Sequence, residues 1–192
     1  MTSVLLVDTI KNSLDSSSNV AITGGIIAPG TIVQTQHATT NSRTSVAGTT
    51  FTSLLSVNIT PKSSSSKILV SCMFNGASTD RYAAIKLFRT VGGTSTQIAS
   101  NGDVSGNRTP VWFEVFGNHA VWTTDGWQYQ TFNHNGVFYD SPSTTSQITY
   151  AIHGGNTTNS GTLWMNRMTY GDTDAAWNHY PQTSLTAQEI AQ

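Results

Sequence analysis

The side chains best suited to metal binding or to proton transfer near neutral pH are histidines. The chain has five, at His37, His119, His134, His153 and His179. No two of them have the short spacing of a local zinc motif. A threefold axis would offer another route, because one histidine from each of three chains makes a three-nitrogen site. We nevertheless expect isolated histidines with ordinary hydrogen-bond partners, and neither a metal nor another cofactor.

Carboxylates are scarce, with ten in 192 residues. A glycosidase needs two that converge. Glu114 lies on an aromatic-rich strand pattern and Asp125 follows shortly after it, but nothing in the spacing selects that pair. Asp172 and Asp174 have a calcium-compatible spacing, although a solvated turn is the expected structure. The chain has no phosphate-binding glycine loop, nucleophile elbow or zinc-protease helix. We therefore predict that it is not an enzyme.

Aromatic side chains gather in the second half of the chain. Three of them are assigned to the core: Trp112, Phe116 and Trp164. Trp127 and Trp177 differ, because they lie among polar turn residues, where a ring is a usual platform for a sugar or a partner surface. The predicted receptor or subunit contacts in these two regions are Trp127, Tyr129, Trp177, His179 and Tyr180.

Composition predicts which elements position these residues. Thr (30) and Ser (23) are abundant, charged residues are only 10%, and hydrophobic residues are 37%. This combination differs from a disordered chain, which has low hydrophobicity and high net charge. Thr favours strands, and Ser, Asn and Gly supply turns. The net charge of −1 does not indicate a basic surface for binding nucleic acid.

Two further features limit the possibilities. The single cysteine, Cys72, rules out an intrachain disulfide framework, and its apolar surroundings predict a buried thiol. No apolar stretch reaches 18 residues, so we expect no membrane insertion. The N-terminus has no basic region, and Asp8 interrupts its short apolar run, so it does not resemble a signal peptide.

Short strand patterns separated by turn clusters begin at Thr31. Alternation is clearest in 55–59, 112–116 and 148–152. The turn signals include Gly92-Gly93, Asn135-Gly136 and Gly154-Gly155. Such spacing indicates a sandwich or a barrel, and of these we predict an all-β, jelly-roll-like β-sandwich over residues 31–192. The predicted strands are 31–38, 51–60, 67–75, 82–90, 95–99, 111–117, 120–123, 128–132, 146–153 and 162–169.

Residues 1–30 have a different pattern. Short apolar segments alternate here with polar stretches and with Gly24-Gly25, and a Pro-Gly breaker ends the region. These segments cannot bury their apolar faces alone, so they need another copy of the chain or a larger assembly. We therefore predict a short, extended N-terminal attachment or oligomerisation arm. Its docking residues are Val4, Leu5, Leu6, Val7 and Ile10.

The last segment, Ser184–Ile190, allows two structures. Thr186 and Glu189 have the spacing of a capping box, which favours a short helix. The same segment is also compatible with a final strand that closes the sandwich.

Several blocks of the sequence resemble tail-fibre-like virion proteins of marine bacteriophages of the cyanophage type. The most specific is 51–70, a strand, a Pro-started serine turn and a second strand. The others are 7–12, 28–34 and 184–190, the last being similar to the family's closing strand, which favours a strand there. The resemblance covers both ends of the chain, and the region between Arg81 and Pro181 fits only loosely.

This resemblance implies a homotrimeric phage structural protein located in the virion and assembled in the cytoplasm of the host bacterium. The arm would dock onto other phage virion proteins, and the head would bind the host surface, with a surface glycan as a further partner. Because the long repetitive shaft of a typical fibre is missing, a short tail fibre or spike is the expected form. The alternatives are a capsid decoration or head-fibre (cement) protein and a free, lectin-like carbohydrate-binding module.

Overall fold

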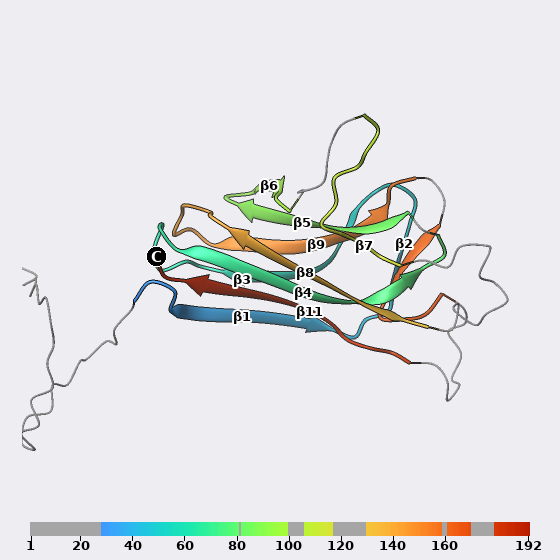
Figure 1. The fold of residues 1–192 in the computed structure, drawn as a ribbon, viewed down its shortest axis with the longest axis horizontal. Coiled ribbons are helices and arrows are strands. Elements are labelled where there is room, and N and C mark those ends of the chain that lie inside the picture. The colour runs from blue at the N-terminus through green and yellow to red at the C-terminus, as the bar shows by residue number, and fades with distance from the viewer. Residues whose placement is uncertain (1–27, 81, 100–105, 117–129, 159–160, 170–178) are drawn as a thin grey trace, which may run out of the picture.

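The computed structural model describes residues 28–80, 82–99, 106–116, 130–158, 161–169 and 179–192. Within these ranges the chain forms eleven β-strands (Figure 1). In chain order they are β1 (Ile32–Thr40), β2 (Thr44–Ala47), β3 (Thr52–Ile59), β4 (Lys67–Ser78), β5 (Ala83–Val91), β6 (Thr94–Gln97), β7 (Phe113–Glu114), β8 (Phe132–Asp140), β9 (Ile148–Asn156), β10 (Thr162–Met165) and β11 (Thr183–Ile190). In the described part of the chain, no helix is long and apolar enough to cross a membrane.

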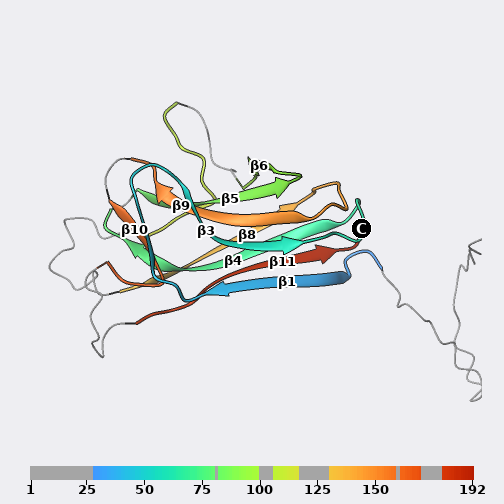
Figure 2. The same ribbon diagram turned by 180° about the vertical axis from the view of Figure 1, so that it is seen from behind.

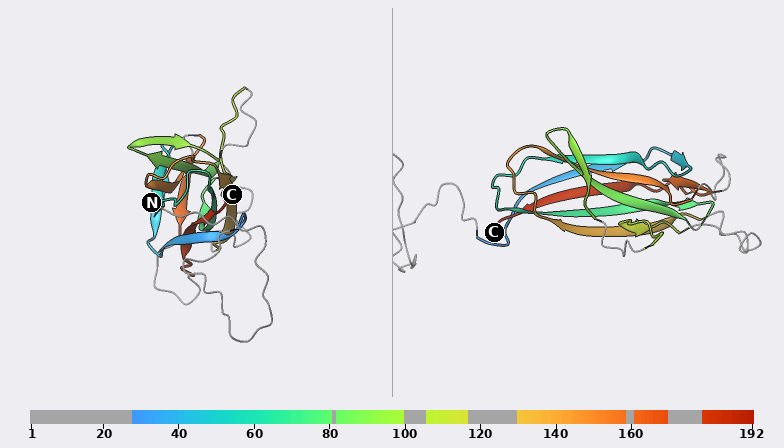
Figure 3. Two further views of the ribbon diagram at one scale, coloured as in Figure 1. Left: turned by 90° about the vertical axis from the view of Figure 1, so that its left-hand side faces the viewer. Right: turned by 90° about the horizontal axis from the view of Figure 1, so that it is seen from above.

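The strands form two antiparallel sheets that pack as a β-sandwich (Figure 3). Sheet A has the order β1-β11-β4-β10-β2, and β8 pairs with β4 in addition. Sheet B has the order β3-β9-β5-β6, and β7 pairs with β5. The prediction of an all-β sandwich is confirmed.

The strand order is that of a jelly roll. The principal strands, in chain order, are β1, β3, β4, β5, β6, β8, β9 and β11. Sheet A contains the first, eighth, third and sixth of these, and sheet B the second, seventh, fourth and fifth. Such a double sheet of eight strands is the jelly-roll architecture. β2 and β10 extend sheet A at the end opposite the C-terminus (Figure 2).

Every second residue of the main strands faces the core between the sheets, as the period of two along a strand requires. On β4 the inward residues are Ile68, Val70, Cys72 and Phe74, all at most 3% exposed. Facing them from sheet B are Ile85, Leu87, Ile148, Tyr150 and Ile152, all fully buried. The predicted buried thiol is confirmed, and burial raises the pKa of Cys72 to about 12.

Two predicted turns are wrong. Asn135-Gly136 lies inside β8, and Gly154-Gly155 lies inside β9. These glycines leave room for side chains instead of bending the chain. A Cβ on Gly136 would lie 2.6 Å from the Trp112 ring and 2.7 Å from the Phe113 ring. Glycine in a strand often marks such a close approach.

Other differences concern strand limits and one aromatic residue. The strands β2 and β8 were not predicted, apart from Phe132 at the end of the strand predicted at 128–132. Residues 128–129 and the strand predicted at 120–123 lie outside the described residues. Phe116 was assigned to the core but is 49% exposed. The alternation after β7 turns Val115 inward and Phe116 outward, where its ring packs 4.8 Å from that of Phe132. Trp112 and Trp164 are half-buried.

The C-terminal segment is a strand, β11, as the resemblance favoured. It pairs with β1 on one side and β4 on the other, so it closes the centre of sheet A. Seven consecutive residues of β11, from Ser184 to Ile190, match seven of β4. The sandwich therefore depends on the last residues of the chain.

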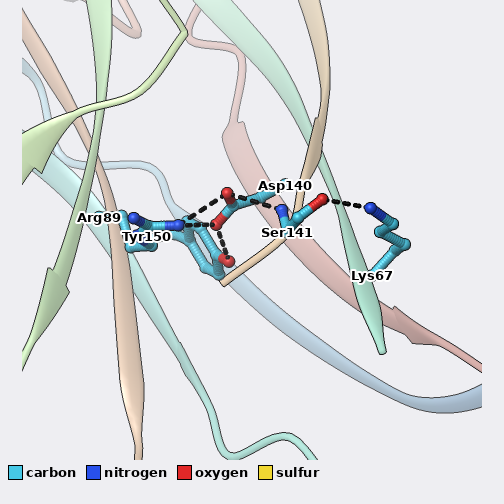
Figure 4. A network of polar contacts seen from close by, with 5 residues as sticks. All are labelled: Lys67, Arg89, Asp140, Ser141 and Tyr150. Atoms are coloured by element: carbon cyan, nitrogen blue, oxygen red, sulfur yellow. Dashed lines mark hydrogen bonds and ion pairs between the residues drawn. The ribbon is translucent and has the colours of Figure 1, made fainter. Parts of the chain in front are cut away.

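A polar network joins the two sheets (Figure 4). Arg89 of β5 donates to both carboxylate oxygens of Asp140, at 2.8 and 3.0 Å, and the Tyr150 hydroxyl of β9 donates to the same carboxylate at 2.7 Å. Asp140 ends β8, so sheet B holds sheet A at this point. Burial, followed by the hydrogen bond to Asp140, raises the pKa of Tyr150.

Candidate functional site

The first candidate surface is the end of the sandwich at which strand β1 begins and strand β11 ends. The Gly30 amide donates to the Ala191 carbonyl at 2.8 Å, and the Ala191 amide donates to the Thr31 carbonyl at 2.9 Å. These bonds place Gly30, where the predicted arm ends, beside Ala191 near the C-terminus. We call this the arm end. It is the end marked C in Figure 1.

One buried carboxylate organises the arm end. Glu189 is fully buried, and it accepts hydrogen bonds from the Lys62 amide at 2.7 Å and from the Ser63 amide at 3.2 Å. Its other oxygen accepts from Gln34 Nε2 at 2.6 Å. Burial would raise the pKa of Glu189, but the hydrogen bonds from Gln34, Ser66, Lys62 and Ser63 lower it below its usual value. Glu189 is therefore an ionised structural anchor.

Three of the sequence blocks singled out in the sequence analysis meet at this anchor. Gln34 belongs to the block 28–34, the serine turn to the block 51–70, and Glu189 to the block 184–190. Gln34 also donates to the Thr60 carbonyl at 2.7 Å. The three blocks therefore form one structural unit at the arm end. The predicted docking residues Val4, Leu5, Leu6, Val7 and Ile10 lie outside the described residues, as does the block 7–12.

The opposite end, which we call the loop end, is fastened by Asn166. This residue is fully buried and has a positive φ of 58°. Its amide nitrogen donates to the carbonyls of Thr40 and Ser42, at 2.8 and 3.0 Å, while its Oδ1 accepts from the Thr183 hydroxyl at 2.7 Å. Asn166 thus ties the exit of β1 to the start of β11.

Two of the five predicted contact residues can be placed at the loop end. His179 is exposed, and Tyr180 is 42% exposed with the Arg43 guanidinium 4.8 Å from its ring centre. Trp127, Tyr129 and Trp177 lie outside the described residues. The strands that follow these three residues in the sequence start at this end, since β8 begins at Phe132 and β11 at Thr183.

The outer face of sheet A is a third candidate surface. Its residues alternate with the buried ones, and their burial pattern shows that they face away from the core. Val137 is 66% exposed, Tyr139 50% and Met73 41%. None of the residues in the central rows of this face carries a formal charge. These rows consist of Thr35, His37 and Thr39 of β1, Ser184, Thr186 and Gln188 of β11, Leu69, Ser71 and Met73 of β4, and Asn135, Val137 and Tyr139 of β8.

The described histidines are far from forming a common site. His37 lies on the outer face of sheet A, with Nδ1 2.8 Å from the Thr186 hydroxyl. His134 is stacked on Phe113, and its Nε2 accepts from the Phe116 amide at 3.3 Å. His153 lies with its ring centre 4.3 Å from that of Phe88. Burial lowers the pKa of both His134 and His153.

The other candidate sites considered from the sequence were a metal site and pairs of carboxylates. Among the described residues, no three His, Cys, Asp or Glu side chains lie close enough together to hold a metal ion. Glu114 is exposed on β7 and borders a pocket together with Arg108. Asp125, Asp172 and Asp174 lie outside the described residues, so their predicted arrangements are untested.

The anchoring residues were not selected from the sequence. Glu189 carried one available signal, since a strand over 184–190 places it on the same face as Leu185 and Ala187. A carboxylate on an apolar face is expected to need dedicated hydrogen-bond donors. Asn166 and Asp140 gave no comparable signal, because their partners are distant in sequence.

No protein-family model matches the chain, and no curated protein matches it. Among solved structures, the chain is similar to a chain in the structure of the infectious bursal disease virus Gx strain, with 11% sequence identity and a TM-score of 0.37. That alignment covers 91% of this chain and 43% of the other. A second is "Crystal structure of infectious bursal disease virus VP2 subviral particle", with 14% identity, a TM-score of 0.32, and coverage of 84% and 38%. The chain thus spans less than half the length of either viral chain.

Proposed function

We propose that this chain is a bacteriophage virion structural protein, a short tail-fibre or spike-like homotrimer. Residues 1–30 dock onto another virion protein, and residues 31–192 present the jelly-roll head for host-surface binding. The observation that carries this proposal is the polarity of the head. The arm root is fixed at one end of the sandwich, and the predicted contact segments are joined to strands at the other.

This polarity suits an attachment protein for a geometric reason. A head held at its arm end leaves its loop end directed away from the particle. Glu189 stiffens the arm end by binding the arm-proximal strand β1 and the serine turn at once. A force applied to the arm would therefore be transmitted to β1 and then to the centre of sheet A, because β11 pairs with both β1 and β4.

The outer face of sheet A supports association with further copies of the chain. Val137, Tyr139 and Met73 expose a large part of their apolar surface there, and the neighbouring rows carry hydroxyl and amide groups. Charged residues are depleted in the cores of protein interfaces, while aromatic residues and methionine are enriched. A second copy of the chain offers the same uncharged surface, so contact would bury no unpaired charge.

We propose a binding role without catalysis. Within the described residues, Glu114 is the one carboxylate that borders the pocket beside β7. Glycoside hydrolysis of the usual kind needs a second carboxylate.

This protein would reach the virion after synthesis in the cytoplasm of the host bacterium.

The test of docking is a variant with serine in place of Val4, Leu5, Leu6, Val7 and Ile10 in the full chain. We expect it to be lost from purified virus particles, as detected by immunoblotting, while the head keeps its melting temperature. A matched control exchanges five residues of the polar stretch 11–19 for serine or asparagine and should be retained. Normal incorporation of the arm variant would overturn the docking role.

A capsid decoration protein would use the same arm, so it differs only in where the protein lies on the particle. Immunogold labelling of intact particles distinguishes a tail position from a capsid position. A free lectin-like module needs no arm, and it would be absent from purified particles altogether.

A further inference from the structure

A polar pocket at the loop end has no part in the anchoring or docking described above. It has a volume of about 450 Å³ and lies between the start of β5, the segment 106–111, β7 and the residues that follow β9. The segment 106–112 stands out from the sandwich beside β5 and β7 in Figure 1. Sites for small molecules usually have volumes of about 300–1,000 Å³. The pocket is thus of a size for one or two sugar rings.

Backbone pairing fixes the shape of this pocket. Ala83 and Ala84 both border it, and both are 1% exposed. The Val115 amide donates to the Ala83 carbonyl at 2.9 Å, and the Thr157 amide donates to the Tyr82 carbonyl at 2.8 Å. These backbone hydrogen bonds hold the chain at Val115 and at Thr157 against Ala83, the first residue of β5, and against the preceding Tyr82.

Side chains of several hydrogen-bonding types border the space. Six of them are Asn107, Arg108, Thr109, Glu114, Thr157 and Thr158. Arginine only donates, an ionised glutamate only accepts, and asparagine and threonine do both. A pair of neighbouring sugar hydroxyls likewise donates and accepts. Tyr82 also borders the pocket.

The charges of the lining favour a neutral ligand. Arg108 and Glu114 carry one charge of each sign, so the described lining has no net charge. A phosphate or carboxylate would gain from Arg108 but would be repelled by Glu114. A neutral polyhydroxylated ring can bind both groups at once.

We infer that the pocket bordered by Arg108 and Glu114 binds a neutral saccharide unit of a host-surface glycan. This inference deepens the proposed function and rests on it for the source of the sugar. The site is distinct from the contacts predicted at Trp127, Tyr129, Trp177, His179 and Tyr180. A saccharide here would be held by hydrogen bonds at the loop end, on the side of the head that faces away from the arm.

The test is saturation-transfer difference NMR of the full chain with the methyl glycosides of glucose, galactose and mannose and with N-acetylglucosamine. At least one should bind, and Arg108→Ala and Glu114→Gln should each weaken it about tenfold, as expected for a lost hydrogen bond to a charged group. Lys62→Ala, which removes one exposed charge at the arm end, should leave binding unchanged.

Two results would overturn the inference. One is binding that persists unchanged in both pocket variants, which would place the saccharide elsewhere. The other is the absence of binding by all four sugars. Neither result bears on docking, because incorporation into particles is measured with the arm variant and does not involve this pocket.

Discussion

At the scale of single residues, the arm end depends on one buried carboxylate. Glu189 satisfies two backbone amides of the serine turn and the side-chain amide of Gln34. Its pKa in the folded chain lies below the ordinary value of 4.5. A group with a lowered folded pKa contributes stability that is fully present above the unfolded value and is lost as the pH falls through the folded pKa.

Glu189→Gln should therefore lower the free energy of unfolding by about 1–3 kcal/mol at neutral pH, because the new amide group faces donors instead of accepting from them. The difference from the wild type should shrink as the pH falls below 4.5. Urea denaturation at neutral pH and at about pH 3 measures both values. Lys62→Ala is the control, because it removes an exposed side chain but keeps the amide that binds Glu189. A difference that does not change with pH would contradict the assigned role.

Gly76 is a second residue at which a substitution is expected to destabilise the fold. A Cβ at this position would collide with the backbone carbonyl oxygen of Trp164, across the pairing of β4 with β10. Gly76→Ala should lower the free energy of unfolding by about 1–3 kcal/mol, because the two strands have to separate. Chemical denaturation measures the loss. The control, Ser71→Ala on the outer face of the same strand, should change the free energy of unfolding little. Equal stability of the two variants would contradict the expected collision at Gly76.

At the scale of elements, Asn166 controls how the loop end is assembled. Asn166→Asp keeps the acceptor for Thr183 but replaces the donor to the Thr40 and Ser42 carbonyls by a second oxygen. We expect a loss of about 2 kcal/mol or more in the free energy of unfolding, because buried acceptors would face a carboxylate. Thermal unfolding followed by circular dichroism measures it.

A matched control for that substitution is Asn58→Asp on β3. Asn58 is exposed, and its Oδ1 accepts from the Thr149 hydroxyl at 2.6 Å, which an aspartate can also do. The control should unfold at nearly the wild-type temperature. If Asn166→Asp did the same, the anchoring of β1 and β11 through Asn166 would be wrong.

The elements also show what the sequence could predict. Alternation located the core strands, because Ile148, Tyr150 and Ile152 repeat every second residue and all face inward. The interpretation of glycine pairs as turns failed, since Gly136 and Gly154 lie inside strands and make room for side chains that come from distant parts of the chain. For the same reason the pocket could not be foreseen. Its walls come from residues 82–84, 107–114 and 157–158, which only the pairing of β5 with β7 and β9 brings together.

At the scale of the whole molecule, the head has two different ends and one outer face whose central rows carry no formal charge. The arm end joins the chain termini of the sandwich, and the loop end carries the pocket. The outer face of sheet A connects the two ends along β1, β11, β4 and β8. A trimer formed through this face would align three arms in one direction and three pockets in the other. Binding several glycans at once would then raise the overall affinity without new contacts.

The most direct test of the account is the solution mass of the full chain, by light scattering, against that of the Val137→Lys/Tyr139→Lys double variant. The wild type should have three times the 20.6 kDa mass of one chain. The variant should be a monomer, because two charges would enter the contact without partners. A control with lysine in place of Ser56 and Thr94, both exposed on sheet B, should remain trimeric. A monomeric wild type, or a double variant that stays trimeric, would contradict the account.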